Sequence, residues 1–230
     1  MRAPGPPIPD YLENTYSWAY LHPWSLRVFE RDWVVNLILW GNMKRLTQAV
    51  VDEVGQGPCA KTQQLACVYG DFSRALASEL ADRNAELDLV DVAPIQLMNA
   101  RDKLAGHDNV RFVHNDATEL AAADEEYDLS ILFFLMHEQP EPARRATLAE
   151  ALRVTRPGGR LIVVDYSAPN ARLPLKWVMW PILHWLEPFA LDLWRQPLTD
   201  FLPAGADVRL LQHRQFFGGL YQKAVFQRVS

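Results

Sequence analysis

Hydrophobic positions in the middle of the chain form short runs that alternate with longer segments of helical spacing. The short runs predict strands at residues 63–68, 86–91, 110–114, 127–135 and 160–165. The longer segments predict helices at residues 72–82, 94–105 and 141–154. Such alternation indicates a mostly parallel sheet that is covered by helices on both faces.

Two further β-rich runs, at residues 207–212 and 223–229, would complete a sheet of seven strands. The sequence thus predicts an α/β fold of the Rossmann-like type. The third predicted helix should stop at Arg156-Pro157-Gly158-Gly159, because proline and paired glycines end a helix and turn the chain into the next strand.

All eight tryptophans lie in two segments that flank this sheet, at positions 18, 24, 33, 40, 177, 180, 185 and 194. Residues 10–50 read as helical and aromatic, and residues 171–203 as an apolar insertion broken by prolines. We expect a cap over residues 1–50 and a sheet domain over residues 51–230 that contains this insertion. Because ligands bind beyond the carboxyl ends of such strands, both segments could form a lid over that edge, or pack as ordinary helices.

Composition limits the class of protein. A chain of 230 residues with 49% hydrophobic residues can bury a large core, and a net charge of −5 argues against a nucleic-acid partner. Two cysteines, Cys59 and Cys67, are too sparse for a disulfide framework and fit free thiols in a reducing compartment. The first residues lack the pattern of a signal peptide, so we expect a cytoplasmic protein.

No segment reaches the roughly 20 apolar residues that a membrane-spanning helix needs. However, WVVNLILWGNM (33–43) and WVMWPILHWL (177–186) are uncharged and rich in tryptophan, which favours interfaces. The second run has Arg172, Lys176 and Arg195 nearby. The sequence therefore predicts peripheral contact with a membrane, made by apolar insertion more than by charge.

The polar residues at the predicted strand ends indicate a nucleotide-type ligand. The segment 65–72 joins the first strand to its helix, where a nucleotide loop should lie. The second strand ends at Asp91, where a carboxylate can bind both ribose hydroxyls, and the third ends at Asn115-Asp116. Each carboxylate could instead cap a helix, but consecutive strand ends at one edge favour a shared adenosine-type ligand.

Over residues 60–165, these features and the Arg156-Pro157-Gly158-Gly159-Arg160 turn resemble the class I S-adenosylmethionine-dependent methyltransferases. The resemblance implies a cofactor site formed by Ala66, Val68, Tyr69, Gly70, Asp71, Asp91, Val92, Asp116 and Ala117.

A narrower resemblance covers nearly the whole chain. The segments IPDYLENTYSWAYLHP, FERDWVVNLILWGN, ACVYGDFS, VDVAPIQL, FLMHEQP and FFGGLYQKAVF are similar to the RquA family of rhodoquinone biosynthesis proteins. That family converts ubiquinone to rhodoquinone by replacing a ring methoxy group with an amino group. The resemblance implies S-adenosylmethionine as nitrogen donor, a requirement for manganese(II) and a place at the inner membrane.

The loop departs from the methyltransferase pattern of an acidic residue followed by three spaced glycines. Ala66 stands in place of the acid, Val68 and Phe72 replace the outer glycines, and Gly70 remains. The site could have decayed, but Asp91 is still available for the adenosine half. In the family that acid lies near the cofactor ammonium group, and its loss lowers the pKa of the amine. We therefore expect chemistry at the amine, which would add to the methoxy-bearing ring carbon.

Candidate metal ligands stand at two neighbouring strand ends. His137 and Glu138 follow the fourth strand and Asp165 ends the fifth, a set of donors that suits manganese. Quinone O-methyltransferases use two glutamates and a histidine near the same strand end. In this chain, Phe134 occupies the approximate place of the first glutamate. The alternatives are capping or base positioning by His137 and a loop hydrogen bond for Asp165.

The candidate catalytic residues are Tyr69, His137 and Glu138. Tyr69 is chosen because its loop position should place it beside the cofactor. Other tyrosines could stack on a quinone ring, although ordinary packing is the better expectation for them: Tyr11, Tyr16, Tyr20 and Tyr166. The favoured function is amination of ubiquinone. The alternatives are a quinol or small-molecule methyltransferase and a non-catalytic module that binds quinone or membrane. The oligomeric state is left open.

Overall fold

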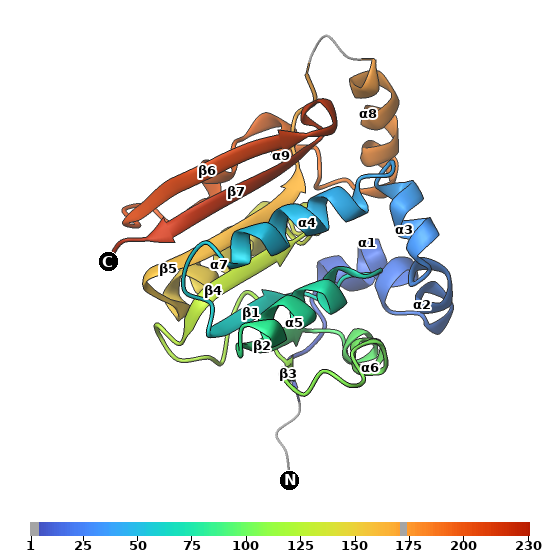
Figure 1. Ribbon diagram of the computed structural model, residues 1–230. Helices are drawn as coiled ribbons and strands as arrows, with labels where there is room; N and C mark the ends of the chain where they lie inside the picture. Colours follow the sequence, from blue (N-terminus) through green and yellow to red (C-terminus); the bar gives the residue numbers. More distant parts are fainter. Residues whose placement is uncertain (1–4, 171–173) are drawn as a thin grey trace.

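The computed structural model describes residues 5–170 and 174–230. Its centre is a seven-stranded sheet with the order β3-β2-β1-β4-β5-β7-β6 (Figure 1). The strands are β1 Lys61–Leu65, β2 Glu86–Asp91, β3 Val110–His114, β4 Tyr127–Phe133, β5 Thr155–Tyr166, β6 Val208–Phe216 and β7 Tyr221–Arg228. The first five strands are parallel, whereas β7 runs antiparallel to β5 and β6. The predicted fold class is confirmed.

Helices cover both faces of the sheet. α4 (Met43–Val54) and α5 (Phe72–Asp82) lie against one face, and α7 (Glu141–Val154) lies against the other (Figure 1). α6 (Pro94–Lys103) packs against β2 and β3. α5 and α7 have the predicted bounds, and α6 ends two residues earlier than the predicted 94–105.

The bounds of β1, β4, β5, β6 and β7 differ from the prediction. β6 ends four residues after the predicted 212, and β7 begins two residues before the predicted 223. β1 and β4 end before the predicted 68 and 135, because Ala66 (φ 70) and Phe134 (φ 58) adopt left-handed backbone conformations that leave the extended ladder. β5 begins before the predicted 160, because Thr155 already pairs with Tyr127 of β4 ahead of an irregularity in register. The predicted turn at residues 156–159 therefore lies inside β5, where Gly158 has a φ of +79°.

The flanking segments are helical and lie beyond the carboxyl ends of the central strands (Figure 1). The N-terminal helices are α1 (Asp10–Tyr20), α2 (Pro23–Phe29) and α3 (Asp32–Ile38). The insertion contains α8 (Leu175–Leu186) and α9 (Asp192–Arg195). Its residues 171–173, which include Arg172, lie outside the described residues. α4 runs without a break across residues 50 and 51, where the cap was expected to end.

A continuous hydrophobic core joins these segments to the sheet. It includes Val35 and Leu39 from the N-terminal helices, and Met179 and Leu183 from α8. The helical lid and the insertion are thus packed on the same core as the sheet. Among the described residues, no helix is long and apolar enough to cross a membrane.

Candidate active site

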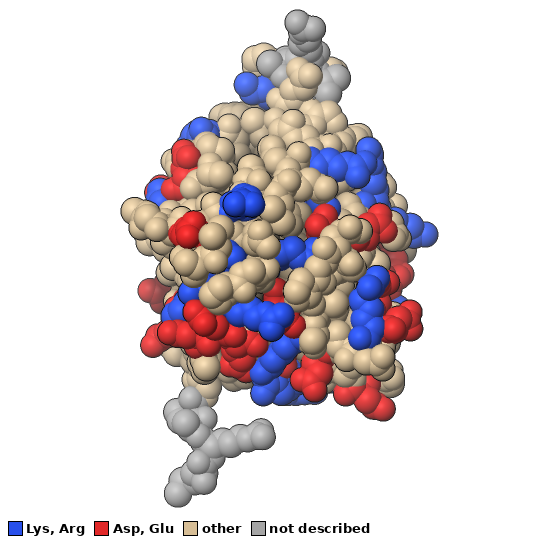
Figure 2. All heavy atoms as spheres, turned by 60° about the vertical axis from the view of Figure 1, so that its left-hand side comes forward, with Lys and Arg blue, Asp and Glu red and all other residues tan. Residues whose placement is uncertain are grey.

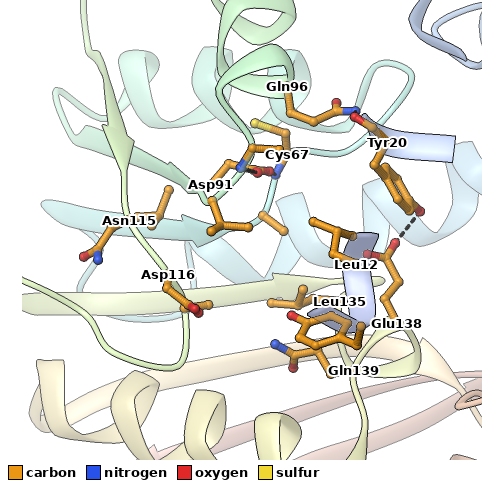
Figure 3. A pocket seen from close by; sticks show the side chains of 16 residues that line it. Leu12, Tyr20, Cys67, Asp91, Gln96, Asn115, Asp116, Leu135, Glu138 and Gln139 are labelled. Atoms are coloured by element: carbon orange, nitrogen blue, oxygen red, sulfur yellow. Dashed lines mark hydrogen bonds between the residues drawn. The ribbon is translucent and has the colours of Figure 1, made fainter. Parts of the chain in front are cut away.

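Two cavities lie where the strand order reverses, between β1 and β4, which is the ligand-binding position of open α/β sheets. The smaller measures about 50 Å³ and the larger about 270 Å³. Tyr20, Cys67 and Glu138 line both of them, so the cavities are neighbours; Figure 3 shows these three residues in the smaller cavity.

Asp91, at the end of β2, is the anchor of the smaller cavity. Its two carboxylate oxygens each accept a backbone N–H group, from Cys67 and from Ala93, at 2.7 Å. Burial raises the pKa of Asp91, and these two hydrogen bonds oppose the shift. Each carboxylate oxygen has a second lone pair. Asp91 can therefore hold the loop in place and still accept hydrogen bonds from a ligand.

The structure brings most of the predicted cofactor residues together, but not all. The smaller cavity is lined by Ala66, Asp91, Val92, Asp116 and Ala117. Val68 and Tyr69 instead line the larger cavity. Asp71 pairs with Arg74 on the surface, and Gly70 is absent from the described lining of either cavity.

Asp116 caps no helix, because a turn and not a helix follows β3. Its Oδ1 accepts hydrogen bonds from the backbone N–H and the hydroxyl of Thr118, both at 2.8 Å. Asp116 therefore stabilises the turn after β3 while it lines the smaller cavity beside Asn115 (Figure 3). The Asp116 carboxylate can stabilise the turn and line the cavity at the same time, because the turn forms part of the cavity wall.

Lys103, which the sequence did not single out, supports the loop after β1 from behind. Its Nζ donates hydrogen bonds to the carbonyl oxygens of Val68 at 2.7 Å and Gly70 at 3.0 Å. The same ammonium group pairs with Glu30 of the cap at 2.6 Å. A nearly buried cation thus fixes this loop and ties it to the segment that follows α2.

Tyr69 connects the loop to the cap. Its hydroxyl donates a hydrogen bond to the Ala19 carbonyl at 2.7 Å and accepts one from Gln96 at 2.8 Å. Its ring stacks on that of Tyr20, with the centroids 5.7 Å apart and the planes 7° from parallel. Burial raises the pKa of Tyr69 to about 12. The hydroxyl of this predicted catalytic residue thus stays protonated and holds the cap.

The larger cavity combines aromatic rings with a few acidic and basic groups. Its rings come from Trp18, Tyr20, Phe29, Tyr69, Phe133, Phe134 and Tyr166. Its ionisable groups include His137, Glu138 and Glu187. A planar apolar ligand with polar substituents suits this lining, because rings stack on its faces while the polar groups orient it.

His137 is held by a buried carboxylate at the end of β5. Its Nδ1 lies 3.0 Å from Asp165 Oδ1, and its backbone N–H donates to Asp165 Oδ2 at 3.2 Å. On the other side of the ring, Nε2 lies 3.8 Å from Glu187 Oε2. Burial lowers the pKa of His137, but Asp165 and then Glu187 outweigh it and raise the pKa to about 9. The imidazole is therefore protonated near neutral pH.

Glu138 accepts a hydrogen bond from the hydroxyl of Tyr20 at the boundary between the cavities (Figure 3). Burial raises the pKa of Glu138 to about 8, although the charge of His137 and the Tyr20 hydrogen bond lower it. Both His137 and Glu138 are thus predominantly protonated near neutral pH. They can donate hydrogen bonds, or a proton, to an oxygen atom in the larger cavity.

The predicted three-ligand manganese site is wrong as an arrangement of side chains. Within residues 5–170 and 174–230, no group of three or more His, Cys, Asp or Glu residues is placed to hold a metal ion. The physical reason is that the donors are bonded to one another or to the cap. Asp165 Oδ1 lies 3.0 Å from His137 Nδ1, so these two donors face each other, and Glu138 turns toward Tyr20.

Sequence reasoning missed two residues of the larger cavity. Tyr20, which was expected to pack, lines both cavities and bonds to Glu138. Glu187 is the first acidic residue after the apolar run of α8, and that isolated charge is the signal that could have identified it. Nothing in the spacing around Tyr20 distinguishes it from Tyr16, which is fully buried in the core.

Comparison with known proteins agrees with this geometry. Residues 64–159 match the family model described as a methyltransferase domain. A demethylmenaquinone methyltransferase of Clavibacter sepedonicus is 36% identical over 127 residues, which are 55% of this chain and 48% of the relative. A protein of the same name from Staphylococcus aureus (strain JH9) is 28% identical over 149 residues, 63% of this chain and 61% of the relative.

Solved structures share the fold at low sequence identity. The structure of LaPhzM has a TM-score of 0.68 at 20% identity, over 94% of this chain and 63% of that one. The [4+2]-cyclase SpnF has a TM-score of 0.62 at 17% identity, over 80% and 81%. A SAM-dependent methyltransferase from Aquifex aeolicus has a TM-score of 0.54 at 18% identity, over 80% and 89%.

The fold is that of the class I methyltransferases, and the two cavities lie at the carboxyl edge of its sheet. Residues 64–159 are the segment that matches the methyltransferase domain in sequence as well. The chain spans about half the length of the curated relatives it matches, from 48% to 61%. The same fold carries a cyclase, so the reaction must be argued from the site.

Proposed function

We propose that this chain is an S-adenosylmethionine-dependent enzyme that modifies the ring of a quinone or quinol. One observation carries the proposal. The cavity anchored by Asp91 shares Tyr20, Cys67 and Glu138 with a larger cavity of aromatic rings. A cofactor in the first would therefore meet a planar acceptor in the second across these three side chains.

The residues of the smaller cavity suit the adenosine half of this cofactor. Asp91 offers lone pairs at the end of β2, and Asp116 lies at the neighbouring strand end. α1 contributes Tyr11 and Leu12 to the lining of this cavity.

The residues of the larger cavity can stabilise negative charge on a quinone oxygen. His137 and Glu138 are protonated near neutral pH, and each can donate to an oxygen that gains charge when the ring is attacked. Asp165 and Glu187 keep the His137 ring oriented from its two sides. This arrangement serves any reaction that adds a nucleophile to a quinone ring.

We further propose that the reaction forms rhodoquinone from ubiquinone. The amine of bound S-adenosylmethionine would add to the methoxy-bearing ring carbon, and methoxide would leave with a proton from that nitrogen. The electrons of the neighbouring Cα–H bond would then reduce the quinone ring, and water would hydrolyse the resulting imine, which breaks the bond between the nitrogen and the methionine skeleton and releases the aminated quinol. Support comes from the RquA-like segments and from Ala66, which puts no carboxylate at the loop position where methyltransferases carry one. Manganese has no role in this proposal, because its expected ligands do not converge.

A second candidate is methylation of a quinol ring, and the comparisons favour it. The relatives that match by sequence are named demethylmenaquinone methyltransferase. In that case the cofactor would supply a methyl group instead of nitrogen, and the polar groups of the larger cavity would orient the quinol.

Product mass separates these reactions. The purified chain is incubated with ubiquinone and with S-adenosylmethionine made from nitrogen-15 methionine, with and without manganese. An aminoquinone that carries the label supports the amination. An added methyl group supports the second candidate, and an aminoquinone without label would overturn S-adenosylmethionine as the nitrogen donor. No product with either quinone or quinol would leave a binding module as the better explanation.

A further inference from the structure

α3 and α8 expose large apolar side chains at one end of the molecule. α8 buries Met179 and Leu183 against the core and turns most of its remaining side chains outward, with Trp177 77% and Trp185 81% exposed. On α3, Leu37 is 69% exposed. We call the following side chains the two-helix patch: Trp33, Leu37, Trp177, Trp180, Trp185 and Leu186. A helix whose exposed side is apolar is the reverse of an ordinary surface helix.

The two-helix patch is continuous with the larger cavity. Ile38 and Leu39, at the end of α3, and Leu186, at the end of α8, all line that cavity. Figure 1 shows α3 and α8 next to each other beyond the carboxyl ends of the strands. The exposed apolar surface therefore borders the cavity in which we place the acceptor ring.

Charge is distributed in a way that suits a lipid surface. The acidic and basic residues of Leu175–Leu186 are Lys176 and His184, and α3 has Asp32 at its first position. Lys176 is exposed immediately before Trp177, and Arg31 is exposed two positions before Trp33. Figure 2 shows that acidic side chains on the face it displays gather mainly in the lower part of the molecule, away from its upper end.

We propose that the two-helix patch docks on the surface of a lipid bilayer, with the larger cavity facing the lipid. Tryptophan suits this position, because its ring enters the apolar layer while its N–H group keeps polar partners among the headgroups. A dry contact with a second copy would have to supply an acceptor for each indole N–H. A bilayer supplies headgroups and water without that constraint, and a contiguous exposed apolar patch is typical of interaction sites.

The docking proposal rests on the proposed function for one point alone, which is the identity of the ligand in the larger cavity. If the ligand is a quinone, it can pass from the bilayer into the cavity between α3 and α8 without crossing water. The attachment itself depends on apolar insertion, so raising the salt concentration should change it little.

The test uses the full chain and vesicles of phosphatidylcholine and phosphatidylglycerol that contain no quinone. Co-sedimentation is measured for the wild type and for the triple variant Trp33→Ser, Trp177→Ser, Trp185→Ser. The control variant, Met98→Ser with Leu211→Ser, removes side chains that are 62% and 47% exposed on α6 and β6. We expect the triple variant to lose roughly tenfold or more in partition coefficient, and the control to bind as the wild type.

A second measurement needs no substitution. Lipids brominated along their acyl chains should quench the tryptophan fluorescence of the wild-type chain, because the indole rings reach the apolar layer. Binding of S-adenosylhomocysteine is followed in all variants, so a failure of docking is distinguished from a failure of the proposed function. Unchanged co-sedimentation of the triple variant would overturn the proposal. So would a wild type that ignores vesicles but forms dimers that the triple variant loses.

Discussion

The hydroxyl of Tyr20, the last residue of α1, donates a hydrogen bond to the carboxyl group of Glu138, which lies 118 positions further along the chain. Both side chains line both cavities. The contact therefore joins the cap to the carboxyl edge of the sheet at the boundary that a transferred group must cross. This position makes the pair the first target for mutation.

Tyr20→Phe should reduce turnover by about tenfold or more while leaving the affinity for S-adenosylhomocysteine nearly unchanged. The lost hydrogen bond normally lowers the pKa of Glu138. In the variant that pKa rises, so the limb of the pH–rate profile that reports Glu138 should move to higher pH. Tyr127→Phe, which removes a buried hydrogen bond to Asp88 away from the cavities, is the control. A profile that does not move would assign Tyr20 a packing role.

Glu138→Gln should change how stability depends on pH. The pKa of Glu138 is about 8 in the folded chain against an ordinary value of 4.5. Between these values the folded chain binds more protons than the unfolded chain, so its stability falls as the pH rises. Glutamine does not titrate. From about pH 5 to about pH 8, the free energy of unfolding of the variant should therefore gain roughly 3 to 4 kcal/mol relative to the wild type.

Urea unfolding at a series of pH values measures this difference. The control is Glu126→Gln, because Lys61 lowers the pKa of Glu126 and its titration lies below that window. The pKa of His137 is raised to about 9, so its protonation also stabilises the folded chain. This stabilisation is lost as the pH rises through about 9 in all three proteins. Parallel pH curves for Glu138→Gln and the wild type would contradict the assignment.

Asp91→Asn should weaken the binding of S-adenosylhomocysteine by roughly tenfold to a hundredfold, because a ligand hydroxyl loses its bond to a charged acceptor. Asp88→Asn lies on the same strand but faces Arg111 and Tyr127, and serves as the matched control. Titration calorimetry measures both affinities, and thermal unfolding checks that the loop held by Asp91 is still folded. Equal affinities in the two variants would exclude Asp91 as an adenosine ligand.

Ala66→Asp tests whether the missing loop acid matters to the proposed amination. The φ of 70° at this position suits aspartate better than most residues, so the change adds charge with little backbone strain. A carboxylate beside the cofactor ammonium group would keep it protonated, and incorporation of labelled nitrogen should fall by about tenfold or more. The binding of S-adenosylhomocysteine should be retained.

Ala66→Gly is the matched variant without the charge. Glycine adopts a positive φ freely, so the free energy of unfolding should rise by about 1 kcal/mol, measured by urea unfolding, with amination unchanged. If both variants lose amination equally, the effect belongs to the backbone of the loop and the absence of the acid explains nothing.

The sequence by itself determined the fold and one edge of the site. Periodicity is a local property, and parallel strands joined by helices must present their carboxyl ends on one side. The positions of Asp91 and Asp116 at the ends of consecutive strands were therefore enough to place them together, and both line the smaller cavity. The predicted ends of β1 and β4 were less accurate. Ala66 and Phe134 end these strands by adopting left-handed backbone conformations, and the pattern of hydrophobic residues does not mark such a conformation in a residue other than glycine.

The tertiary structure alone decided which partners the ionisable groups have. His137 faces Asp165 and Glu187, Glu138 faces Tyr20, and Lys103 holds the loop after β1. The predicted metal ligands failed for this reason, since three donors near each other along one edge need not point at one place. Side-chain direction depends on the packing of helices that are remote in sequence, and no periodic pattern of hydrophobic residues encodes it.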